Sequence, residues 1–551
     1  IDPPATRPKH LLRNRILLMA HFYGIYQSNQ SLFKYFDQFD SSPSETIVIW
    51  NNFFVDAMGI SFGHAIAWDP ALTTVEFCNA SQRGIYRLFR GILQNSIKIV
   101  RIVFSEYGYV DFPRLETKGV TESFVTSYSF SECSPNFINH FFNSTQNSPL
   151  EYRDLVFFKI NFEENGSFLM VLESLTRSRG SQFTSSVLFS NTIVREFKMD
   201  AFMGCIHSLA QLTSLTVTNS NMDYTIMLAS VCTAESRITS VTLVNGRFRK
   251  RLSTLGLALP PNLVMLDISF SYITSMNLVD LFVLLTQTPL RIPIIFRAMK
   301  LTVALKFYNL LGEVDMEHFS SNIAELDWSG NKFAKSSTAN FFKFLNTQHR
   351  LRLLTLYNVT IANTREFWSC LREYLFREQL QGVEIGGKFP GSILLEFMEC
   401  LRDATFVRRL QIRCGATHDA GCELMEQIIQ SLPNLKEVKL DGFRPRNVDK
   451  WYNMWMSVLN HPNIFSCDIP SFDLRTLKMK KRKERPPEVH AMIRQIRGKK
   501  RPTTHRQRAQ FIIDNLGSNT FDETSNSNFF DMLAAADLEN DTSDDPDIHQ
   551  E

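Results

Sequence analysis

The sequence predicts an α/β solenoid, built from a short parallel strand and a helix repeated many times. The pattern apolar-x-x-apolar-x-apolar, which marks a short strand with one buried face, recurs at Leu212–Val217, Leu263–Ile268 and Leu435–Leu440. Its middle apolar position returns about every 28 residues. Helix-period stretches separate the strands, for example at Cys422–Leu432 and Val448–Leu459. Strand and helix at one period build a parallel sheet with helices on its other side.

The middle apolar position serves as an index of each unit. The sequence predicts sixteen units, with index positions at 47, 75, 100, 128, 155, 186, 215, 241, 266, 293, 326, 354, 383, 410, 438 and 467. No unit buries its apolar face alone, so neighbours stack into a horseshoe with the sheet on the concave face and the helices on the convex face. This period is typical of the intracellular leucine-rich repeat. The alternative, a doubly wound α/β enzyme, does not keep one period over so long a stretch.

Composition is consistent with a large folded core, and the charge distribution separates the C-terminal region from it. Hydrophobic residues make up 44% of the 551 residues, and the net charge is only +3. Residues 475–508 contain 14 Lys and Arg against 2 acids, whereas residues 509–551 contain 11 acids and no Lys or Arg. We therefore expect a flanking segment or irregular first repeat at 1–43, a solenoid at 44–474, a basic linker with a short helix at 475–508 and an acidic disordered tail at 509–551. The chain starts at Ile1 rather than Met, so the presence of a domain before it remains an open alternative.

The motifs of common enzymes are missing from the sequence. It has no phosphate-binding loop, no dinucleotide fingerprint and no zinc-protease or serine-hydrolase motif. His418 and Cys422 are four residues apart, but a metal needs more ligands than this pair. The 9 Cys form no C-x-x-C pair, which favours a reducing compartment with Cys78, Cys205 and Cys232 as small core residues. We expect no enzyme, cofactor or metal.

The concave face is the predicted binding surface. Residues three after the index are large aromatics in several units, and acids flank the index in others, beside two Arg. Exposed aromatics on a sheet are suitable partner anchors, and a cationic peptide would fit the acidic strip. The alternative is that loops cover the aromatics and that the acids are ordinary solvated surface. The predicted protein-binding residues are Trp50, Phe158, Phe189, Phe296, Tyr357, Asp267, Glu325, Asp327, Glu384, Arg409 and Arg413.

The tail carries two basic clusters and several apolar patches. The basic residues are Lys480, Lys481, Arg482, Lys483, Lys499, Lys500 and Arg501. They favour an anionic membrane surface or a partner, a nuclear address, or a solvated run at the end of the solenoid. Between them Val489, Met492, Ile493 and Ile496 recur at helical spacing, and either dock on a partner or cap the last repeat. Phe529, Phe530 and Leu533 form a further docking patch in the acidic tail.

Sixteen repeats of this type, followed by a basic segment with the pairs Arg485-Pro486 and Arg501-Pro502 and then a tail, resemble the CARMIL family of actin regulators. The resemblance covers the body, about 430 residues. It implies a non-enzymatic scaffold of actin assembly. The implied partners are capping protein, the actin-branching complex and class-I myosin, at the plasma-membrane cortex of the cytoplasm.

Two other protein classes use the same repeat and remain open alternatives. Substrate receptors of ubiquitin ligases bind their targets on such arrays, and so do GTPase-activating proteins for Ran, which also end in an acidic tail. No specific nucleic-acid binding is predicted, and the basic clusters leave nuclear import open as a second location.

Overall fold

A computed structural model gives the fold. It describes residues 46–50, 59–60, 62–64, 66–67, 72–79, 82–95, 99–108, 124–162, 166–195, 199–233, 236–301, 306–333, 338–375, 380–387, 391–414, 417–481 and 487–498. The chain divides into two units, Ile1–Leu351 and Arg352–Glu551. The main sheet has sixteen parallel strands in chain order, which makes the fold an α/β leucine-rich-repeat solenoid.

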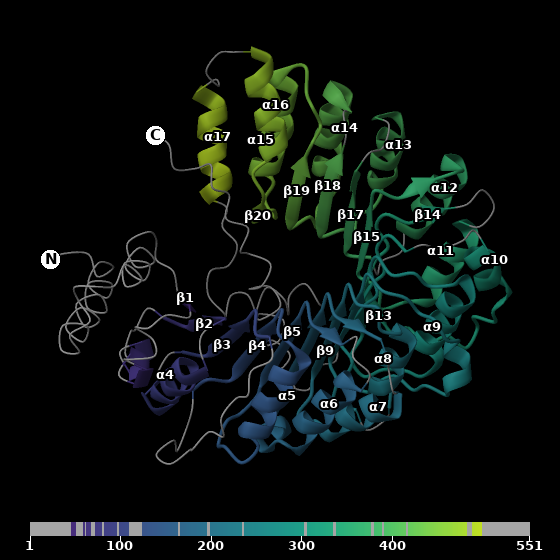
Figure 1. The fold of residues 1–551 in the computed structure, drawn as a ribbon. Helices are drawn as coiled ribbons and strands as arrows, with labels where there is room; N and C mark the ends of the chain where they lie inside the picture. The colour runs from purple at the N-terminus through teal and green to yellow at the C-terminus, as the bar shows by residue number, and fades with distance from the viewer. Residues whose placement is uncertain are drawn as a thin grey trace. The chain divides into compact units, whose positions relative to one another are not determined.

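In the first unit, helices follow the strands and lie on one side of them (Figure 1). The strands of the main sheet are β1 (Thr46–Trp50), β2 (Thr74–Cys78), β3 (Arg101–Ser105), β4 (Ser127–Ser131), β5 (Asp154–Phe158), β7 (Ser186–Ser190), β9 (Ser214–Thr218), β10 (Ser240–Val244), β11 (Met265–Asp267), β12 (Ile294–Arg297) and β13 (Ile323–Asp327). The helices are α4 (Gln82–Asn95), α5 (Pro135–Ser144), α6 (Ser167–Arg177), α7 (Met199–Ser208), α8 (Tyr224–Val231), α9 (Ser275–Gln287), α10 (Lys306–Glu313) and α11 (Thr338–Thr347). Short elements complete the unit: η1 (Arg179–Phe183), η2 (Leu252–Leu255), β6 (Asn161–Phe162), β8 (Ile193–Val194) and β14 (Lys332–Phe333).

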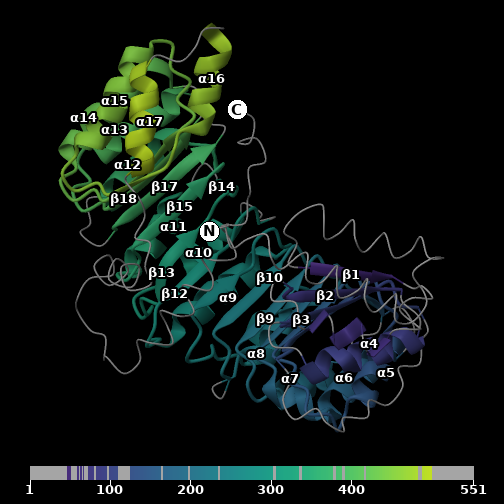
Figure 2. The same cartoon turned by 90° about the vertical axis from the view of Figure 1, so that its left-hand side faces the viewer.

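The second unit repeats the arrangement (Figure 2). Its strands are β15 (Leu353–Tyr357), β17 (Gly382–Gly387), β18 (Arg409–Cys414), β19 (Glu437–Asp441) and β20 (Ser466–Cys467), with the short β16 (Thr360–Ile361). Its helices are α12 (Thr364–Leu375), α13 (Gly391–Leu401), α14 (His418–Ser431), α15 (Val448–Asn460), α16 (Ser471–Lys481) and α17 (Pro487–Gly498). The predicted helical stretches Cys422–Leu432 and Val448–Leu459 correspond to α14 and α15.

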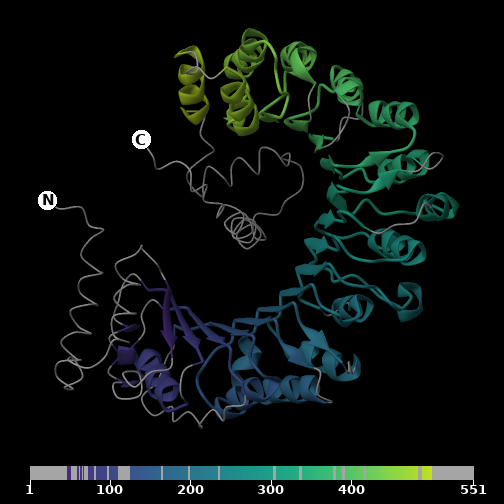
Figure 3. The same ribbon diagram turned by 45° about the horizontal axis from the view of Figure 1, so that its top comes forward.

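Alternate residues of each strand face the helices, as the sequence pattern requires. In β5, Leu155 and Phe157 are buried while Asp154, Val156 and Phe158 are half-buried. In each unit the helices lie on one side of the strands (Figure 3). The index residue and the residue two after it are buried and fill the core between sheet and helices. The residues one before, one after and three after the index face the other way, and we call this side the open face.

A column of phenylalanines occupies the position two after the index in the first unit. Phe77, Phe104, Phe130, Phe157 and Phe189 come from consecutive strands of the sheet, and each ring stacks on the next. The successive ring centroids are 5.6, 5.7, 5.7 and 4.9 Å apart. Fully buried aromatic rings bring large apolar area and favourable stacking to the core. This column, the aromatic spine, contains five of the 46 Phe residues of the chain.

Three predicted index positions are wrong. Val100 is exposed, and Ile102 is the residue in register with Val75 and Tyr128. Val187, not Ser186, pairs with Leu155 and Leu215. Near 293 the register shifts between Ile294 and Ile295, and Phe296 aligns with Leu266 and Leu326.

In the described residues, thirteen strands of the main sheet, all except β1, β18 and β20, are followed by a residue with a left-handed backbone, four positions after the index. Asn79, Asn191, Asn219, Asn245 and Asn358 have φ between 42° and 55° at this position, and Gly330 and Gly442 have φ of 74° and 84°. The backbone N–H of Asn219 donates to the carbonyl of Val244 at 3.0 Å, and that of Asn245 to the carbonyl of Ser269 at 3.0 Å. Asn and Gly suit the left-handed region best. The turn therefore starts these repeats in the same way.

The last repeat is closed by α16 and α17. The Asp441 carboxylate accepts from the backbone N–H of Phe472 at 3.0 Å and of Asp473 at 2.9 Å, so it caps α16. In α17 Val489, Met492, Ile493 and Ile496 are buried, and this helix packs against α15. Of the two roles expected for this apolar face, the structure shows the capping one. In the described part of the chain no helix is long and apolar enough to cross a bilayer.

Candidate binding site on the open face

The open face carries two of the predicted aromatic anchors. Phe158 ends β5 half-buried, and the ammonium of Lys159 lies 5.3 Å from its ring centroid. Lys159 also pairs with Glu132 at 2.7 Å. A cation over an aromatic face holds the ring in place but leaves its edge to solvent.

Tyr357 is the second aromatic on this face and lies over a glycine. It pairs in register with Gly386 on β17 and is half-buried. A Cβ atom added at Gly386 would lie 2.8 Å from Cε1 of the Tyr357 ring. A side chain at this position would also meet the backbone carbonyl of Arg413, so the glycine leaves room both for the ring and for the neighbouring strand β18.

Two predicted aromatic anchors belong to the core instead. Phe189 is 3% exposed and ends the aromatic spine, because the correct index of its strand is Val187. Phe296 is fully buried beside Phe282, with ring centroids 5.7 Å apart, because it is itself an index residue. Their predicted placement on the solvent-facing side is wrong because of the register errors at index positions 186 and 293. The Trp50 side chain lies outside the described residues.

The predicted acids of the first unit do not form an uninterrupted acidic strip. Asp267 and Asp327 lie on β11 and β13, and Arg297 of β12 lies between them in register. The Asp267 carboxylate accepts from the backbone N–H of Ser269 at 2.8 Å, and that of Asp327 from Ser329 at 3.0 Å. Both acids thus cap the following turns. Glu325, half-buried, pairs in register with Ile295.

The second unit brings its predicted charges together in a ladder across three strands. Arg409 lies 2.6 Å from the buried Glu384 and 3.9 Å from Glu437. Lys439 lies 3.9 Å from Glu437 and 3.3 Å from Asp468. We call these five residues the charge ladder. Opposite charges alternate along it, so most of its charge is internally neutralised.

Arg413 stands apart from the charge ladder. It is exposed near the end of β18 and aligns with Asp441 on β19. Asp441 already caps α16, as described above. Arg413 therefore presents a cation to solvent at the edge of the open face, where a ligand carboxylate would reach it.

Arg297, Glu437, Lys439 and Asp468 were missed from the sequence. The residue types were visible, but the pairing needs the register between strands. Arg409, Glu437 and Ser466 each lie one before a correctly predicted index, and they fall on one line across the sheet. The signal was therefore present at positions one before and one after the index.

The described residues contain no group of three or more His, Cys, Asp or Glu that could hold a metal. Burial raises the pKa of the Cys232 thiol to about 12 and raises that of Cys205. Both are packed as apolar core residues, and Cys78 is half-buried. In the basic clusters, Lys480 and Lys481 end α16, but their side chains lie outside the described residues. Arg482, Lys483, Lys499, Lys500, Arg501, Phe529, Phe530 and Leu533 lie wholly outside them.

Comparison with known proteins adds the fold neighbours. No family model matches the chain, and no curated protein matches it. Among solved structures, the TLR13–ssRNA13 complex aligns with 72% of this chain and 67% of its own at 9% identity and a TM-score of 0.34. A leucine-rich-repeat protein from Bacteroides eggerthii aligns with 72% of this chain and 63% of its own at 11% identity and a TM-score of 0.30. Both superpose only weakly on this chain.

Proposed function

We propose that the chain is a non-enzymatic scaffold that binds proteins on the open face of its sheet. The observation that carries this proposal is the register of the open face. Parallel strands bring side chains from successive repeats into one continuous surface, where Tyr357, the charge ladder and Arg413 lie on neighbouring strands. A surface with a half-buried aromatic ring and oriented charges suits a protein ligand.

The specific role we propose is regulation of actin assembly in the manner of CARMIL proteins, in the cytoplasm at the plasma-membrane cortex. Its support is the number and type of repeats together with the basic segment that follows them. The proposed partners are capping protein, the actin-branching complex and class-I myosin. The basic clusters would bring the scaffold to anionic lipid, at about 1 kcal/mol for each basic residue near the surface.

Direct binding of the purified full chain to these three partners tests the proposal. We expect Tyr357→Ala and Arg413→Glu to weaken binding about tenfold, since each removes an anchor from the open face. Arg372→Glu is the matched control, because Arg372 is exposed on the helix α12 and not on the sheet. Equal binding by all three variants would remove the open face as the site.

The same protein tests the alternatives. Faster GTP hydrolysis by Ran would replace the scaffold by a GTPase activator, and co-purification of an adaptor subunit would replace it by a ligase receptor. Location is tested separately by replacing Lys480, Lys481, Arg482 and Lys483 with Gln. Loss of cortical signal with retained partner binding would support the membrane role of this cluster, and import into the nucleus that depends on it would contradict that role.

A further inference from the structure

A groove of about 550 Å³ lies where three strands of the first unit run into their turns, beside the open face rather than on it. Its lining comes from the turns after β9, β10 and β11. The lining residues are Asn219, Ser220, Asn221, Asn245, Gly246, Arg247, Arg249, Phe270 and Tyr272. Amides, guanidinium groups and aromatic rings therefore meet in one hollow, and none of these residues was singled out by the sequence patterns.

Phe270 lies at the one place in its repeat where a bulky residue fits worst. Its φ is 60°, in the left-handed position that Asn219 and Asn245 fill in the two preceding repeats. Its side chain is nevertheless 43% exposed, so burial in the core does not compensate for the unfavourable backbone. An unfavourable backbone under an exposed aromatic ring points to a functional reason for the residue.

Tyr272 extends the apolar part of the groove. It is 52% exposed, and its backbone N–H donates to the carbonyl of Gly246 at 2.8 Å. The backbone N–H of Phe248 donates back to the carbonyl of Tyr272 at 3.0 Å. The ring is thus carried by a fixed backbone. The Lys300 ammonium lies 5.5 Å from the centroid of the Phe270 ring.

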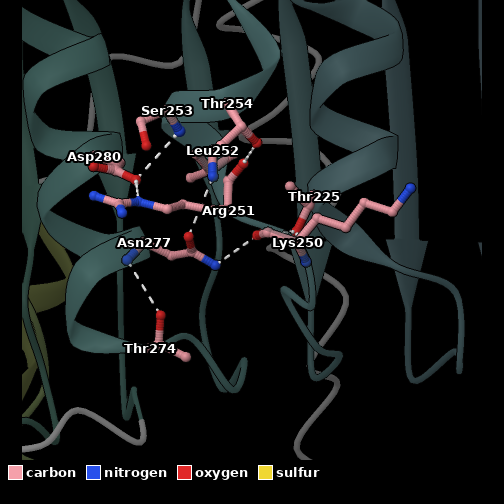
Figure 4. A network of polar contacts seen from close by, with 9 residues as sticks. All are labelled: Thr225, Lys250, Arg251, Leu252, Ser253, Thr254, Thr274, Asn277 and Asp280. Atoms are coloured by element: carbon pink, nitrogen blue, oxygen red, sulfur yellow. Dashed lines mark hydrogen bonds and ion pairs between the residues drawn. The ribbon is translucent and has the colours of Figure 1, made fainter.

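The basic side chains come from the run Arg247–Arg251, whose backbone is held at almost every step. The backbone N–H of Arg249 donates to Asp223 at 3.0 Å, and that of Lys250 to Thr225 at 3.2 Å. Asn277 accepts from the N–H of Leu252 at 3.2 Å and donates to the carbonyl of Lys250 at 2.8 Å (Figure 4).

Arg251, the last cation of this run, has a carboxylate partner within the protein. Asp280 accepts from the backbone N–H of Ser253 at 3.2 Å and pairs with the Arg251 side chain at 3.4 Å (Figure 4). Arg247, Arg249 and Lys250 are exposed. A rigid backbone that presents exposed guanidinium groups lowers the entropy that a ligand must overcome on binding.

We propose that this groove binds an acidic peptide segment of a partner protein that carries aromatic or aliphatic side chains among its carboxylates. The Arg247 fork matches a carboxylate, and Arg249, whose Nη2 also donates to the Asn221 carbonyl at 3.0 Å, adds a second cation. The faces of Phe270 and Tyr272 match apolar side chains. A nucleic acid fits less well, because Arg247 and Arg249 are the only cations among the lining residues, too few for a run of phosphates. This site is distinct from the open face, and its test does not depend on whether the open face binds a partner.

The probe is a fluorescent eight-residue peptide in which Glu alternates with Phe, measured by anisotropy with the full chain. We expect saturable binding that weakens when Gln replaces Glu or Ala replaces Phe. Arg247→Glu should lower the affinity at least about tenfold, because it replaces attraction by repulsion. Arg237→Glu is the matched control: Arg237 is exposed and precedes β10, whereas Arg247 follows that strand. It should change the affinity less than twofold.

Phe270→Asn separates binding from folding. Asn suits the left-handed turn, so the melting temperature should stay the same or rise, while peptide affinity falls about fivefold through loss of the ring. No binding of the peptide, an equal loss in Arg237→Glu, or tighter binding of an oligo-uridylate RNA of the same length would each overturn the proposal.

Discussion

At the scale of single residues, the left-handed position that follows the strands is only partly predictable from residue identity. Asn331 stands at the asparagine position of its repeat pattern, and its side chain accepts from Leu301 N–H at 2.8 Å. The left-handed turn itself lies one residue earlier, at Gly330. In other repeats Glu132, Lys159 and Phe270 occupy that turn position. Since their side chains do not favour a positive φ, no residue preference could have revealed them.

Asp473 is the residue whose burial has a clear effect on stability. It is fully buried, accepts from the backbone N–H of Arg444 at 2.8 Å, and faces the Trp451 indole N–H at 3.4 Å. Burial, aided by the nearby Asp441 charge, raises the pKa of its carboxyl to about 6. The folded second unit therefore binds a proton more tightly than the unfolded chain does.

From this raised pKa we predict that Asp473 contributes most to stability at acid pH. The contribution is complete below about pH 4, where the unfolded carboxyl is also protonated, and is lost as pH rises through about 6, at a cost of about 2–3 kcal/mol. Asp473→Asn should remove this slope in hydrogen exchange of α15 and α16, measured from pH 4 to 7. Asp449→Asn, at an exposed position of α15, should keep it. A slope that survives in Asp473→Asn would contradict the assignment.

At the scale of elements, the strands could be predicted because their apolar alternation is strong, and the errors have local causes. Val100 continues the alternation of its strand one step too early, so the index slipped by two residues to the exposed end. Near Pro293 the register shift between Ile294 and Ile295 breaks the period itself. A local irregularity of the ladder is not encoded in apolar spacing, and it moved Phe296 from the core to the predicted binding face.

The helix α17 offers a test at the same scale. Ile496 is 2% exposed and packs on the side of α17 that meets α15. Ile496→Ala should destabilise this closing helix by about 2–4 kcal/mol, because it leaves a cavity under a short element. Hydrogen exchange of residues 487–498 should rise strongly. Arg494→Ala, at an exposed position of the same helix, is the control. Unchanged protection in Ile496→Ala would mean that α17 does not cap the array in solution.

At the scale of the whole molecule, the sequence predicts the repeat architecture better than the binding site. The fold follows from sixteen agreeing patterns, so the three misplaced index positions do not alter it. The site depends on single residues and on their partners across strands. Glu384 and Arg409 were each predicted, but their 2.6 Å pairing, which largely cancels the acidic strip, appears only when β17 and β18 are aligned.

An array of repeats also predicts that damage stays local. Phe130 stacks between Phe104 and Phe157 in the middle of the aromatic spine. Phe130→Ala should cost about 3–5 kcal/mol and expose β3, β4 and β5 to hydrogen exchange, because repeats are stabilised mainly by their neighbours. Exchange in β17–β19 should stay unchanged. Phe183→Ala, at an exposed position of η1, is the control. A single cooperative loss of protection over both units would refute local unfolding.

The left-handed turn that opens most repeats has a consequence for chirality. A positive φ is the region that a D-amino acid prefers, since its Cβ points away from the carbonyl that crowds an L-residue. In most repeats, therefore, the backbone takes at one point a shape natural to the mirror-image residue. A chemically synthesised chain should accept D-Asn at position 219 or D-Phe at position 270, while the same inversion inside β9 or β10 would disrupt the strand. Most repeats of the solenoid are thus built from L-residues whose backbone follows, at one point, the path of their enantiomers.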